Sequence, residues 1–336
     1  LFLSPYTNRR TDEYGGDIMG RTRLLREVLT EVRKQAGADM PIMLELRVKE
    51  LVNNGIPLEE GLELVKILAP YVDVFEPTVG RNIKQSALSA VEPYYASYGT
   101  LLPYVKAVKD AVPDKAVIAT VKMGLPSLAD RVIAEGQADF VSLGRPLFVD
   151  PEWITKAAKG EDRKILKCIG CMNCITEQTR KEVSPTCHRA CTVNPNNLRE
   201  DDFYHPQPAK EPKRVLVVGG GLAGMEASIR LAKRGHDVTL CEKKNVLGGQ
   251  WIPASRGPEK GDYRTLVPYK ENELKEAGVK VLRNQEVDKA YLQSFGPDIT
   301  VLATGAVPKS LSFEKPLGDH TIFRYYKQVI SLRIQL

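Results

Sequence analysis

A glycine-rich turn joins an apolar strand to a helical stretch in the second half of this 336-residue chain. The apolar run RVLVV at residues 214–218 is followed by GGGLAG at residues 219–224. In a GxGxxG turn the first glycine permits a tight bend, the second lets a pyrophosphate approach the backbone, and the third allows close packing of helix on strand. The turn therefore predicts a parallel α/β sheet that binds a dinucleotide. The candidate contacts are Gly219, Gly221, Ala223 and Gly224.

An acidic residue ends the next strand-like run. Glu242 lies eighteen residues after Gly224, where a carboxylate can bind the hydroxyls of a ribose. The sequences NVLGGQ at residues 245–250 and VLATG at residues 301–305 follow. This pair resembles the FAD domains of flavoprotein reductases with two dinucleotide-binding domains, so FAD or ADP is favoured over NAD. The resemblance adds four candidate contacts, Gly249, Gln250, Thr304 and Gly305.

Residues 1–160 alternate short apolar runs with amphipathic stretches. The expected strands are 41–46, 71–75, 116–121 and 139–143, and the expected helices are 21–35, 58–68, 101–111, 128–135 and 151–158. Strands that alternate with helices form βα units around a parallel sheet. Four such units fit either an open doubly wound domain or half of an eight-stranded barrel, and periodicity does not distinguish them.

A change of composition divides the chain into three parts. Residues 161–210 are rich in Cys, Asn, Pro and Thr and end in a Pro-rich linker. After this linker the alternation of strands and helices returns, with strands expected at 214–218, 237–241, 279–282 and 299–303 and a helix at 223–234. We therefore expect domains at 1–160, 161–210 and 211–336.

Five of the six cysteines lie between Cys168 and Cys191. Cys168, Cys171 and Cys174 follow one another at three-residue intervals, so one short loop can supply three ligands of a cubane. Zinc sites more often use two separated CxxC pairs, and the pattern therefore favours a 4Fe–4S cluster over zinc. Both Cys187 and Cys191 are available as the fourth ligand.

Composition excludes several classes of protein. Hydrophobic residues make up 43% of the chain and charged residues 27%, as in ordinary globular proteins. No apolar run reaches the roughly 18–20 residues that a membrane span needs. The net charge of +6 is spread over interleaved acidic and basic residues, unlike the concentrated charge of a nucleic-acid binder. Cysteines clustered in one segment indicate a metal site in a reducing, cytoplasmic compartment.

Three blocks of sequence together resemble one family. The block SPYTNRRTDEYGG at residues 4–16, followed by Arg21, resembles the loop after the fourth barrel strand of old yellow enzyme-like flavoproteins. The block VSLGRP at residues 141–146, with Asp150-Pro151, resembles their last barrel strand. With the cysteine motif and the FAD-type region, this order is similar to the 2,4-dienoyl-CoA reductase and trimethylamine dehydrogenase branch of the NADH:flavin oxidoreductases.

The resemblance implies a fold and an activity. The fold is the second half of a (β/α)₈ TIM barrel with FMN at its C-terminal face, a 4Fe–4S segment, and a Rossmann-like domain for FAD. Electrons would pass from NAD(P)H through FAD and the cluster to FMN, which would reduce the activated C=C bond of an enoate, enone or dienoyl-CoA. The alternatives are a trimethylamine-type dehydrogenase, a stand-alone FAD and iron–sulfur electron-transfer module, and a zinc-stabilised NAD-binding regulator. Each enzyme acts on a small molecule, and no nucleic acid or membrane is expected as a partner.

The resemblance also assigns roles to five residues of the barrel half. Arg47 matches an arginine near the pyrimidine edge of the flavin, where a cation stabilises the reduced, anionic ring. Lys122 and Met123 match the phosphate-binding turn after the penultimate strand. Gly144 and Arg145 match the turn after the last strand, which also meets the phosphate.

Other positions follow the family pattern less closely. Cys191 matches the last cluster ligand because Cys-x-x-Asn-Pro follows the cluster in relatives, but a longer loop keeps Cys187 open. Asn82 stands near the place of the proton-donating His of dienoyl reductases. The family's catalytic Tyr and first four strands would precede residue 1, and the NAD(P)H domain would lie mostly beyond Leu336. We therefore assign no catalytic residue. We expect an internal fragment whose half-barrel aggregates or pairs with its missing half or with a second copy.

Overall fold

The computed structural model describes residues 1–80, 92–176, 191–197 and 206–306. The chain divides into two compact units, Leu1–Phe148 and Val149–Leu336. Each unit has its own four-stranded parallel sheet and its own apolar core. The cysteine motif belongs to the second unit. The division into three domains at residues 160 and 210 stays a prediction.

The strands of the first unit follow one another in chain order. The sheet consists of the parallel strands β1 (Met43–Lys49), β2 (Val74–Val79), β3 (Ala116–Ala119) and β4 (Phe140–Val141), in the order β1-β2-β3-β4. A doubly wound sheet reverses its strand order at one point, whereas a barrel continues in one direction. The sequential order therefore fits the half-barrel that the resemblance implies.

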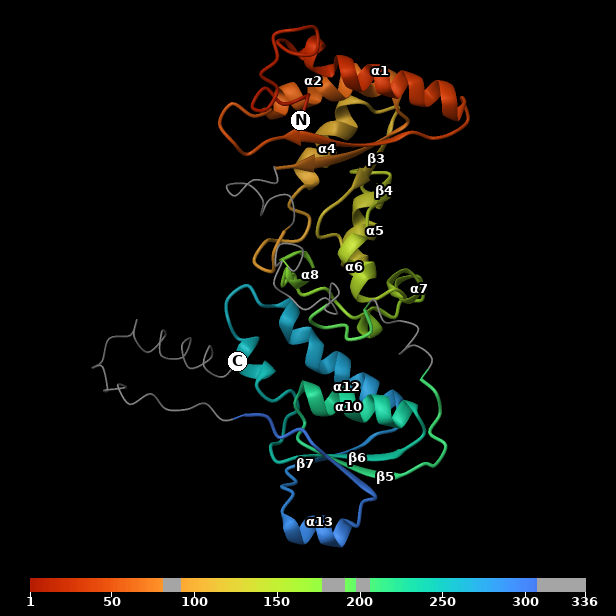
Figure 1. Cartoon of the computed structure of the whole chain (residues 1–336), viewed down its shortest axis with the longest axis vertical. Coiled ribbons are helices and arrows are strands. Elements are labelled where there is room, and N and C mark those ends of the chain that lie inside the picture. Colours follow the sequence, from red (N-terminus) through yellow and green to blue (C-terminus); the bar gives the residue numbers. More distant parts are fainter. Residues whose placement is uncertain (81–91, 177–190, 198–205, 307–336) are drawn as a thin grey trace, which may run out of the picture. The chain divides into compact units, whose positions relative to one another are not determined.

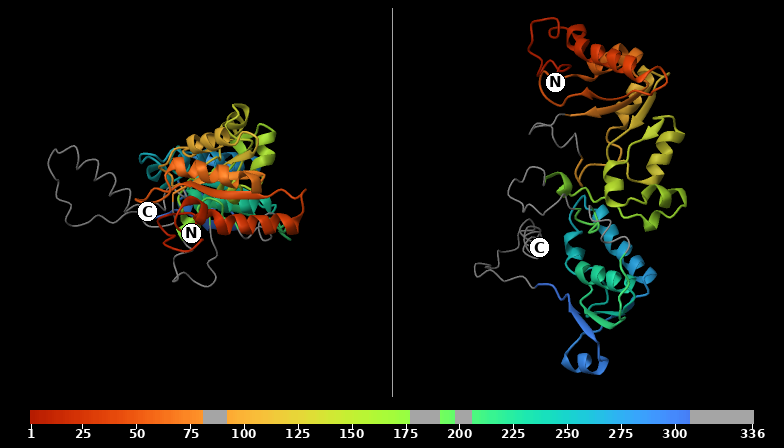
Figure 2. Two further views of the ribbon diagram at one scale, coloured as in Figure 1. Left: turned by 90° about the horizontal axis from the view of Figure 1, so that it is seen from above. Right: turned by 45° about the vertical axis from the view of Figure 1, so that its right-hand side comes forward.

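A helix precedes the first strand of this unit, and one follows each strand. The helices are α1 (Ile18–Ala36), α2 (Leu58–Leu68), α4 (Leu102–Ala111), α5 (Pro126–Ala134) and α6 (Gly144–Val149), with a 3₁₀ turn η1 (Ala69–Tyr71) after α2. At the start of α1, the Asp17 carboxylate accepts a hydrogen bond from the Gly20 amide. Figures 1 and 2 show α1 and α2 on the same side of strands β1 and β2.

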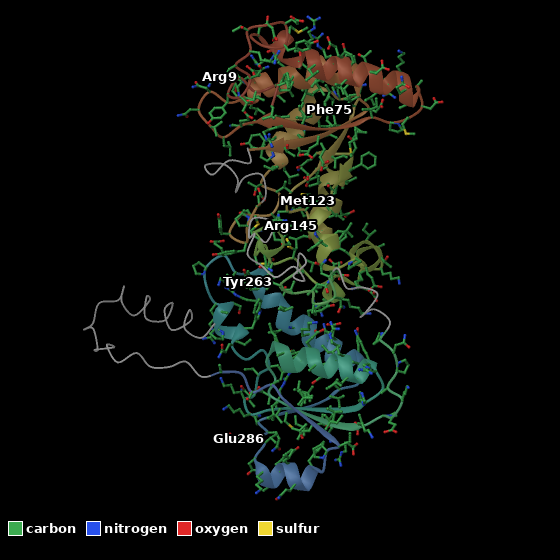
Figure 3. The ribbon with its side chains drawn as sticks, in the orientation of Figure 1. Arg9, Phe75, Met123, Arg145, Tyr263 and Glu286 are labelled. Atoms are coloured by element: carbon green, nitrogen blue, oxygen red, sulfur yellow. The ribbon has the colours of Figure 1, made fainter. Side chains whose placement is uncertain are left out.

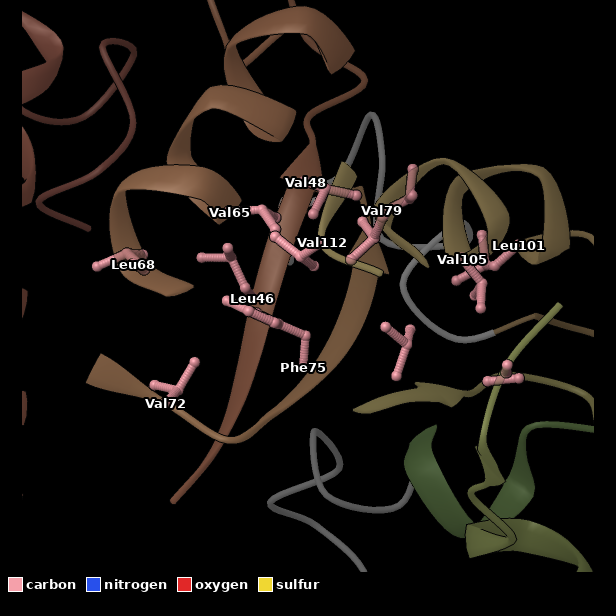
Figure 4. Close-up of a cluster of buried hydrophobic side chains, with 14 of the residues drawn as sticks. Leu46, Val48, Val65, Leu68, Val72, Phe75, Val79, Leu101, Val105 and Val112 are labelled. Atoms are coloured by element: carbon pink, nitrogen blue, oxygen red, sulfur yellow. The ribbon is translucent and has the colours of Figure 1, made fainter. Parts of the chain in front are cut away.

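Apolar side chains of α2 and of strands β1 and β2 form much of the core of the first unit (Figure 4). Leu64, Val65 and Phe75 are completely buried, and Leu46 of β1 packs among them. Burial of each such side chain contributes roughly 1.5–3 kcal/mol to folding. The helical spacing of the apolar residues of α2 thus decides which side of that helix meets the sheet.

The strands of the second sheet are all parallel, but their order in the sheet differs from their order in the chain. From edge to edge it contains β7 (Lys280–Arg283), β6 (Asp237–Glu242), β5 (Arg214–Val218) and β8 (Ile299–Leu302). Helices α10 (Leu222–Lys233) and α12 (Leu266–Glu276) lie on one face of the sheet, and α13 (Lys289–Phe295) lies on the other (Figures 1 and 2). The shorter elements are α7 (Trp153–Ala158), η2 (Asp162–Lys164), α8 (Asn173–Thr176), α11 (Trp251–Ala254) and η4 (Asp262–Thr265).

Strand β2 begins three residues later than the sequence predicts. Residues 69–71 form the 3₁₀ turn η1 instead of a strand. Asp73, which directly precedes β2, makes hydrogen bonds through its side chain. Its carboxylate accepts hydrogen bonds from the Ile42 amide at 2.8 Å and from Arg33 Nη2 at 2.5 Å. Pro77 lies inside β2. Proline is disfavoured in strands because it has no N–H to donate to a neighbouring strand.

Among the described residues, five helices were not predicted from the sequence: α6, α8, α11, α12 and α13. The sequence of α12 is strongly polar and contains Pro268. This proline is the third residue of the helix, in the first turn, where an N–H would have no helical partner. Its position therefore leaves α12 intact, although the residue type argues against a helix.

Candidate functional site

The five predicted FMN contacts lie at or beyond the carboxyl ends of the strands in the first unit. Arg47 is near the end of β1, Lys122 and Met123 follow β3, and Gly144 and Arg145 follow β4. Carboxyl ends of parallel strands meet at one edge of a sheet, the edge at which barrel enzymes bind ligands. Figure 3 labels two of these residues, Met123 and Arg145. The structure therefore brings the five positions to a common edge.

The Arg47 side chain has a buried hydrogen-bond donor with no acceptor among the described residues. Its Nε is buried and has no hydrogen-bond partner in the described part of the chain. Buried N–H groups nearly always have a partner. The pyrimidine edge of a flavin presents carbonyl and ring-nitrogen acceptors, so the orphaned donor fits the contact predicted for Arg47.

The turn after β3 has an unusual backbone. Val121 has a φ of 68° and Lys122 a φ of 53°, which places both in the left-handed region. A β-branched residue is rare there, and such strain is concentrated at functional sites. Lys122 Nζ donates hydrogen bonds to the carbonyl oxygens of Pro93, at 3.4 Å, Tyr94, at 3.2 Å, and Ala96. The strained turn thus aims the Lys122 ammonium at the main chain of residues 93–96.

Met123 and Gly144 differ in what they can offer a ligand. The Met123 side chain is 1% exposed and belongs to the apolar core, which leaves its backbone for a cofactor. At Gly144 an added Cβ would meet no atom within 4 Å. Space is therefore open beside Gly144, as a phosphate contact by the main chain requires.

The sequence analysis missed Glu92, which lies beside two of the predicted residues. Arg145 Nη1 donates to the Glu92 carbonyl oxygen at 2.6 Å. The Glu92 side chain is buried, and its Oε2 has no hydrogen-bond partner among the described residues. Burial raises the pKa of this carboxyl above its ordinary value, although the charges of Lys122 and Arg145 lower it. No sequence motif marks Glu92, because only tertiary packing makes it buried.

Three of the four predicted cluster ligands gather on one apolar surface of the second unit. Cys168, Cys171 and Cys191 pack against a buried cluster formed by Val149, Leu166, Ile169, Val193 and Leu266. Burial raises the pKa of the Cys191 thiol, and the charges at Cys168 and Cys171 raise it further. These three thiols are therefore close enough to interact. Cys174 lies on α8, and Cys187 lies outside the described residues.

The local backbone suits a loop that wraps around a ligand. Gly170 and Met172 both have positive φ, 62° and 64°, within the cysteine motif. The Cys191 sulfur accepts a hydrogen bond from the Asn194 amide at 3.4 Å. Four thiols, of which one is already hydrogen-bonded by the main chain, form a donor set suited to an iron–sulfur cluster. Within the described ranges, no three potential ligand side chains are arranged to hold a metal ion.

The three motif glycines of the second unit serve different purposes. Gly219 has a φ of 109°, and an added Cβ would lie 2.4 Å from the Ala303 carbonyl oxygen. A Cβ on Gly224 would lie 1.9 Å from the Gly219 carbonyl oxygen, because α10 begins so close to β5. At Gly221 a Cβ would meet nothing within 4 Å. The protein's own packing thus requires the first and third glycines, while the second leaves room for a ligand.

Glu242 lies directly beside this turn. Its carboxylate is buried and accepts hydrogen bonds from the Gly220 amide at 2.8 Å and the Lys244 amide at 2.9 Å. The two bonds fix the glycine turn against the end of β6. Each carboxylate oxygen has a second lone pair, so the side chain can also accept ribose hydroxyls, as the sequence predicts.

The remaining predicted contacts of the second unit surround the same turn. A Cβ on Gly249 would lie 3.2 Å from Gly221 Cα, and one on Gly219 would lie 3.2 Å from Thr304 Cα. Gln250 Nε2 donates to the Ala306 carbonyl oxygen at 2.6 Å, which joins the two later segments. Ala223 is exposed on the first turn of α10, and Gly305 has a φ of 75°. The structure therefore places these predicted contacts around one turn, and their role in dinucleotide binding stays a prediction. Asn82 of the first unit lies outside the described residues.

Both units match known protein families. Residues 1–164 match the NADH:flavin oxidoreductase / NADH oxidase family, and residues 213–336 match the pyridine nucleotide-disulphide oxidoreductases. The chain thus combines a domain of the NADH:flavin oxidoreductase family with one of the pyridine nucleotide-disulphide oxidoreductases. The prediction of a barrel domain followed by a Rossmann-like domain is therefore confirmed, and the relatives that carry these domains are oxidoreductases. The two matches also support the use of a flavin and of a nicotinamide nucleotide.

Named relatives span a range of redox enzymes. The chain is 39% identical to the NADH oxidase of Thermoanaerobacter brockii, over 91% of this chain and 46% of the relative. It is 36% identical to the cinnamate reductase of Clostridium sporogenes, over 93% of this chain and 48% of the relative. The chain therefore spans about half the length of the relatives it matches.

Solved structures show the same relationship. A complex of 2-naphthoyl-CoA reductase with 2-naphthoyl-CoA superimposes with a TM-score of 0.83 at 31% identity, covering 93% of this chain and 46% of that one. Histamine dehydrogenase from Rhizobium sp. 4-9 gives a TM-score of 0.82 at 28% identity, covering 92% and 44%. In the described part of this chain, no helix has the length and apolar character of a membrane span.

Proposed function

We propose that this chain is the central part of an iron–sulfur flavoenzyme that uses NAD(P)H to reduce an activated C=C bond. The observation that carries the proposal is the order of three elements, namely a flavin-type strand edge, a cysteine loop and a dinucleotide turn. NAD(P)H delivers two electrons together, a 4Fe–4S cluster carries one at a time, and reduction of C=C takes two electrons and two protons. FAD in the second unit and FMN in the first would each convert between the transfer of two electrons and the transfer of one.

The residues of this chain have defined tasks in the proposal. Cys168, Cys171, Cys174 and Cys191 hold the cluster. Arg47 stabilises negative charge on the reduced FMN ring, and Lys122 and Arg145 bind its phosphate. Two enzymes that contain a similar region, cinnamate reductase and 2-naphthoyl-CoA reductase, are named for the reduction of conjugated acids or their thioesters. This similarity favours an enoate, enone or enoyl-CoA as the substrate.

An amine dehydrogenase is the second candidate, and its support is the similarity to histamine dehydrogenase. In that case the FMN would be reduced by an amine, and the cluster would carry electrons away from it. A small-molecule substrate is common to both candidates. A cytoplasmic location is part of the same proposal, because metal-binding thiols persist in reducing compartments.

Anaerobic assays on the full-length protein separate the two candidates. With NAD(P)H and cinnamate, a simple enone or a dienoyl-CoA, we expect one nicotinamide oxidised for each C=C bond reduced. With histamine or trimethylamine and an artificial electron acceptor, we expect no turnover. The reverse pattern would establish the amine dehydrogenase. No turnover in either anaerobic assay, with NAD(P)H oxidised only once oxygen is admitted, would contradict both.

A further inference from the structure

Glu92 is a buried carboxyl that shares a hydrogen bond with Thr100 through only part of its side chain. Its side chain is 3% exposed, and Oε2 has no hydrogen-bond partner in the described part of the chain. A buried, unsatisfied carboxylate destabilises a protein by several kcal/mol, on the order of the full stability of a small domain, unless the group is neutral or paired with a cation. The surroundings of Glu92 should therefore explain why the residue is there.

Two cations enclose the segment that begins with Glu92. Arg145 Nη1 donates to the Glu92 carbonyl oxygen at 2.6 Å, and Lys122 Nζ donates to the carbonyl oxygens of Pro93, Tyr94 and Ala96. Both cations also act on the Glu92 carboxyl through their charge, and they are the only charged groups among the described residues that shift its titration. The main chain of this segment thus lies against the two residues assigned to the FMN phosphate, and their charges act on its carboxyl.

A phosphate bound at Lys122 and Arg145 would change the net charge around the Glu92 carboxyl. The FMN phosphate is close to a dianion at neutral pH and is matched by the two positive charges. An ionised Glu92 would add a third negative charge in a region of low dielectric constant, where repulsion between like charges is strong. Phosphate binding therefore favours the neutral carboxyl.

We propose that Glu92 is a positioning residue of the FMN phosphate site, which holds residues 92–96 on Lys122 and Arg145 and takes up a proton when the phosphate binds. The inference rests on the proposed FMN site and extends it. Glu92 touches neither the flavin ring nor the substrate in this account. Its effect is on how tightly FMN is held at each pH.

The direction of the pH dependence follows from linkage. In the free site, burial raises the pKa of Glu92 by more than the Thr100 hydroxyl and the two cations lower it. Bound phosphate would raise this pKa further. FMN therefore binds most tightly at low pH. Above the pKa of the free site, its affinity falls as pH rises, by up to about tenfold per pH unit. The phosphate itself titrates at about pH 6, so the contribution of Glu92 is the difference between the pH profiles of the wild-type and Glu92→Gln proteins.

The test is flavin binding to the full-length protein after reversible removal of its FMN. Flavin fluorescence gives the Kd for FMN between pH 5 and 9 in the wild-type and Glu92→Gln proteins. We expect the ratio of the wild-type Kd to the Glu92→Gln Kd to rise with pH within this range, by up to about tenfold per pH unit. Riboflavin, which lacks the phosphate, should bind both proteins equally. Equal riboflavin binding also reports that the first unit of the variant is folded.

A measurement on the unaltered protein covers the case in which Glu92→Gln does not fold. Calorimetry of FMN binding in two buffers of different ionisation enthalpy, repeated from pH 5 to 9, should show a pH range with net proton uptake, and none for riboflavin. Equal Kd values and equal pH slopes in the two proteins, or no proton uptake, would overturn the role of Glu92 while leaving the FMN site intact. A wild-type protein that binds FMN no better than riboflavin would instead overturn the phosphate site, and the inference with it.

Discussion

Gly221 differs from the other two glycines of the GxGxxG turn, because an added Cβ at Gly221 would meet no protein atom within 4 Å. Gly219 and Gly224 would each place a Cβ against main-chain oxygen. The sequence predicts these three positions because a turn between adjacent elements is a local structure. Glu92 was missed for the opposite reason, since its burial depends on the packing of segments distant in the chain.

Gly221→Ala should separate folding from cofactor binding. Gly221 has a φ of −71°, which alanine adopts freely, so we expect the free energy of unfolding to change by less than about 0.5 kcal/mol. The methyl group would occupy the space left for the pyrophosphate, and FAD content should fall at least about tenfold. Gly261→Ala, which also meets no atom within 4 Å, is the control and should keep its FAD. Full FAD content in Gly221→Ala would place the dinucleotide elsewhere.

At the scale of the elements, α10 connects the glycine turn to a buried ionic network on α12. Lys270 Nζ donates to Glu226 Oε2 at 2.8 Å and to Glu273 Oε2 at 2.6 Å, and Arg230 Nε donates to Glu226 Oε1 at 2.6 Å. Such a network is invisible in sequence because its partners come from two helices, and α12 itself was not predicted. The helix α10, by contrast, was predicted to within one residue from its apolar spacing.

Loss of the Glu226 charge should weaken this connection in a pH-dependent way. Burial alone would raise the pKa of Glu226, but Lys270 and Arg230 more than offset it and hold this pKa below its ordinary value. The stabilisation is therefore present above about pH 4.3 and is lost as pH falls through the lowered pKa. Glu226→Gln should lower the free energy of unfolding by about 1–3 kcal/mol at pH 7 and by little at pH 3.

The control for Glu226→Gln is Glu271→Gln, because Glu271 pairs with Arg283 at the surface. Exposed pairs contribute little, so its cost should stay below about 0.5 kcal/mol. Urea unfolding at both pH values measures the two effects. Equal costs for both variants at pH 7 would show that the buried network does not stabilise the second unit.

The loop that carries Cys191 depends on Asn194. This side chain is 5% exposed, donates to the Val149 carbonyl oxygen at 2.9 Å and accepts from the Asn196 amide at 2.9 Å. Asn194→Ala should release the loop and lower the iron content of anaerobically purified protein to less than about half, since outer-sphere contacts orient metal ligands. Asn272→Ala, at an exposed position of α12, should retain the wild-type content. Unchanged iron in Asn194→Ala would argue against Cys191 as a ligand.

At the scale of the whole molecule, the first unit has a sheet with two open edges. Among the described residues, β1 pairs only with β2 and β4 only with β3, and both edges expose large apolar side chains, Met43 and Phe140. The sequence predicts the four strands, but their number does not distinguish a barrel half from an open sheet. The strand order and the family resemblance decide this point, because pairing between strands is a property of the folded chain.

Open, apolar edges predict self-association of residues 1–160 when they are produced alone. We expect an apparent mass that increases with concentration in light scattering, and unfolding that depends on concentration. Residues 206–336, which carry the second sheet, are the comparison. A single, cooperative and concentration-independent transition for residues 1–160 would show that the half-barrel is stable by itself.

The most direct test of the whole account is the cofactor content of the anaerobically purified protein. Released flavins are separated and quantified, and iron and acid-labile sulfide are counted beside the visible spectrum. We predict FAD, FMN and about four irons with as many sulfides per chain. Zinc without any flavin would contradict the account, because neither the cysteine loop nor the two flavin sites would then have the roles assigned to them.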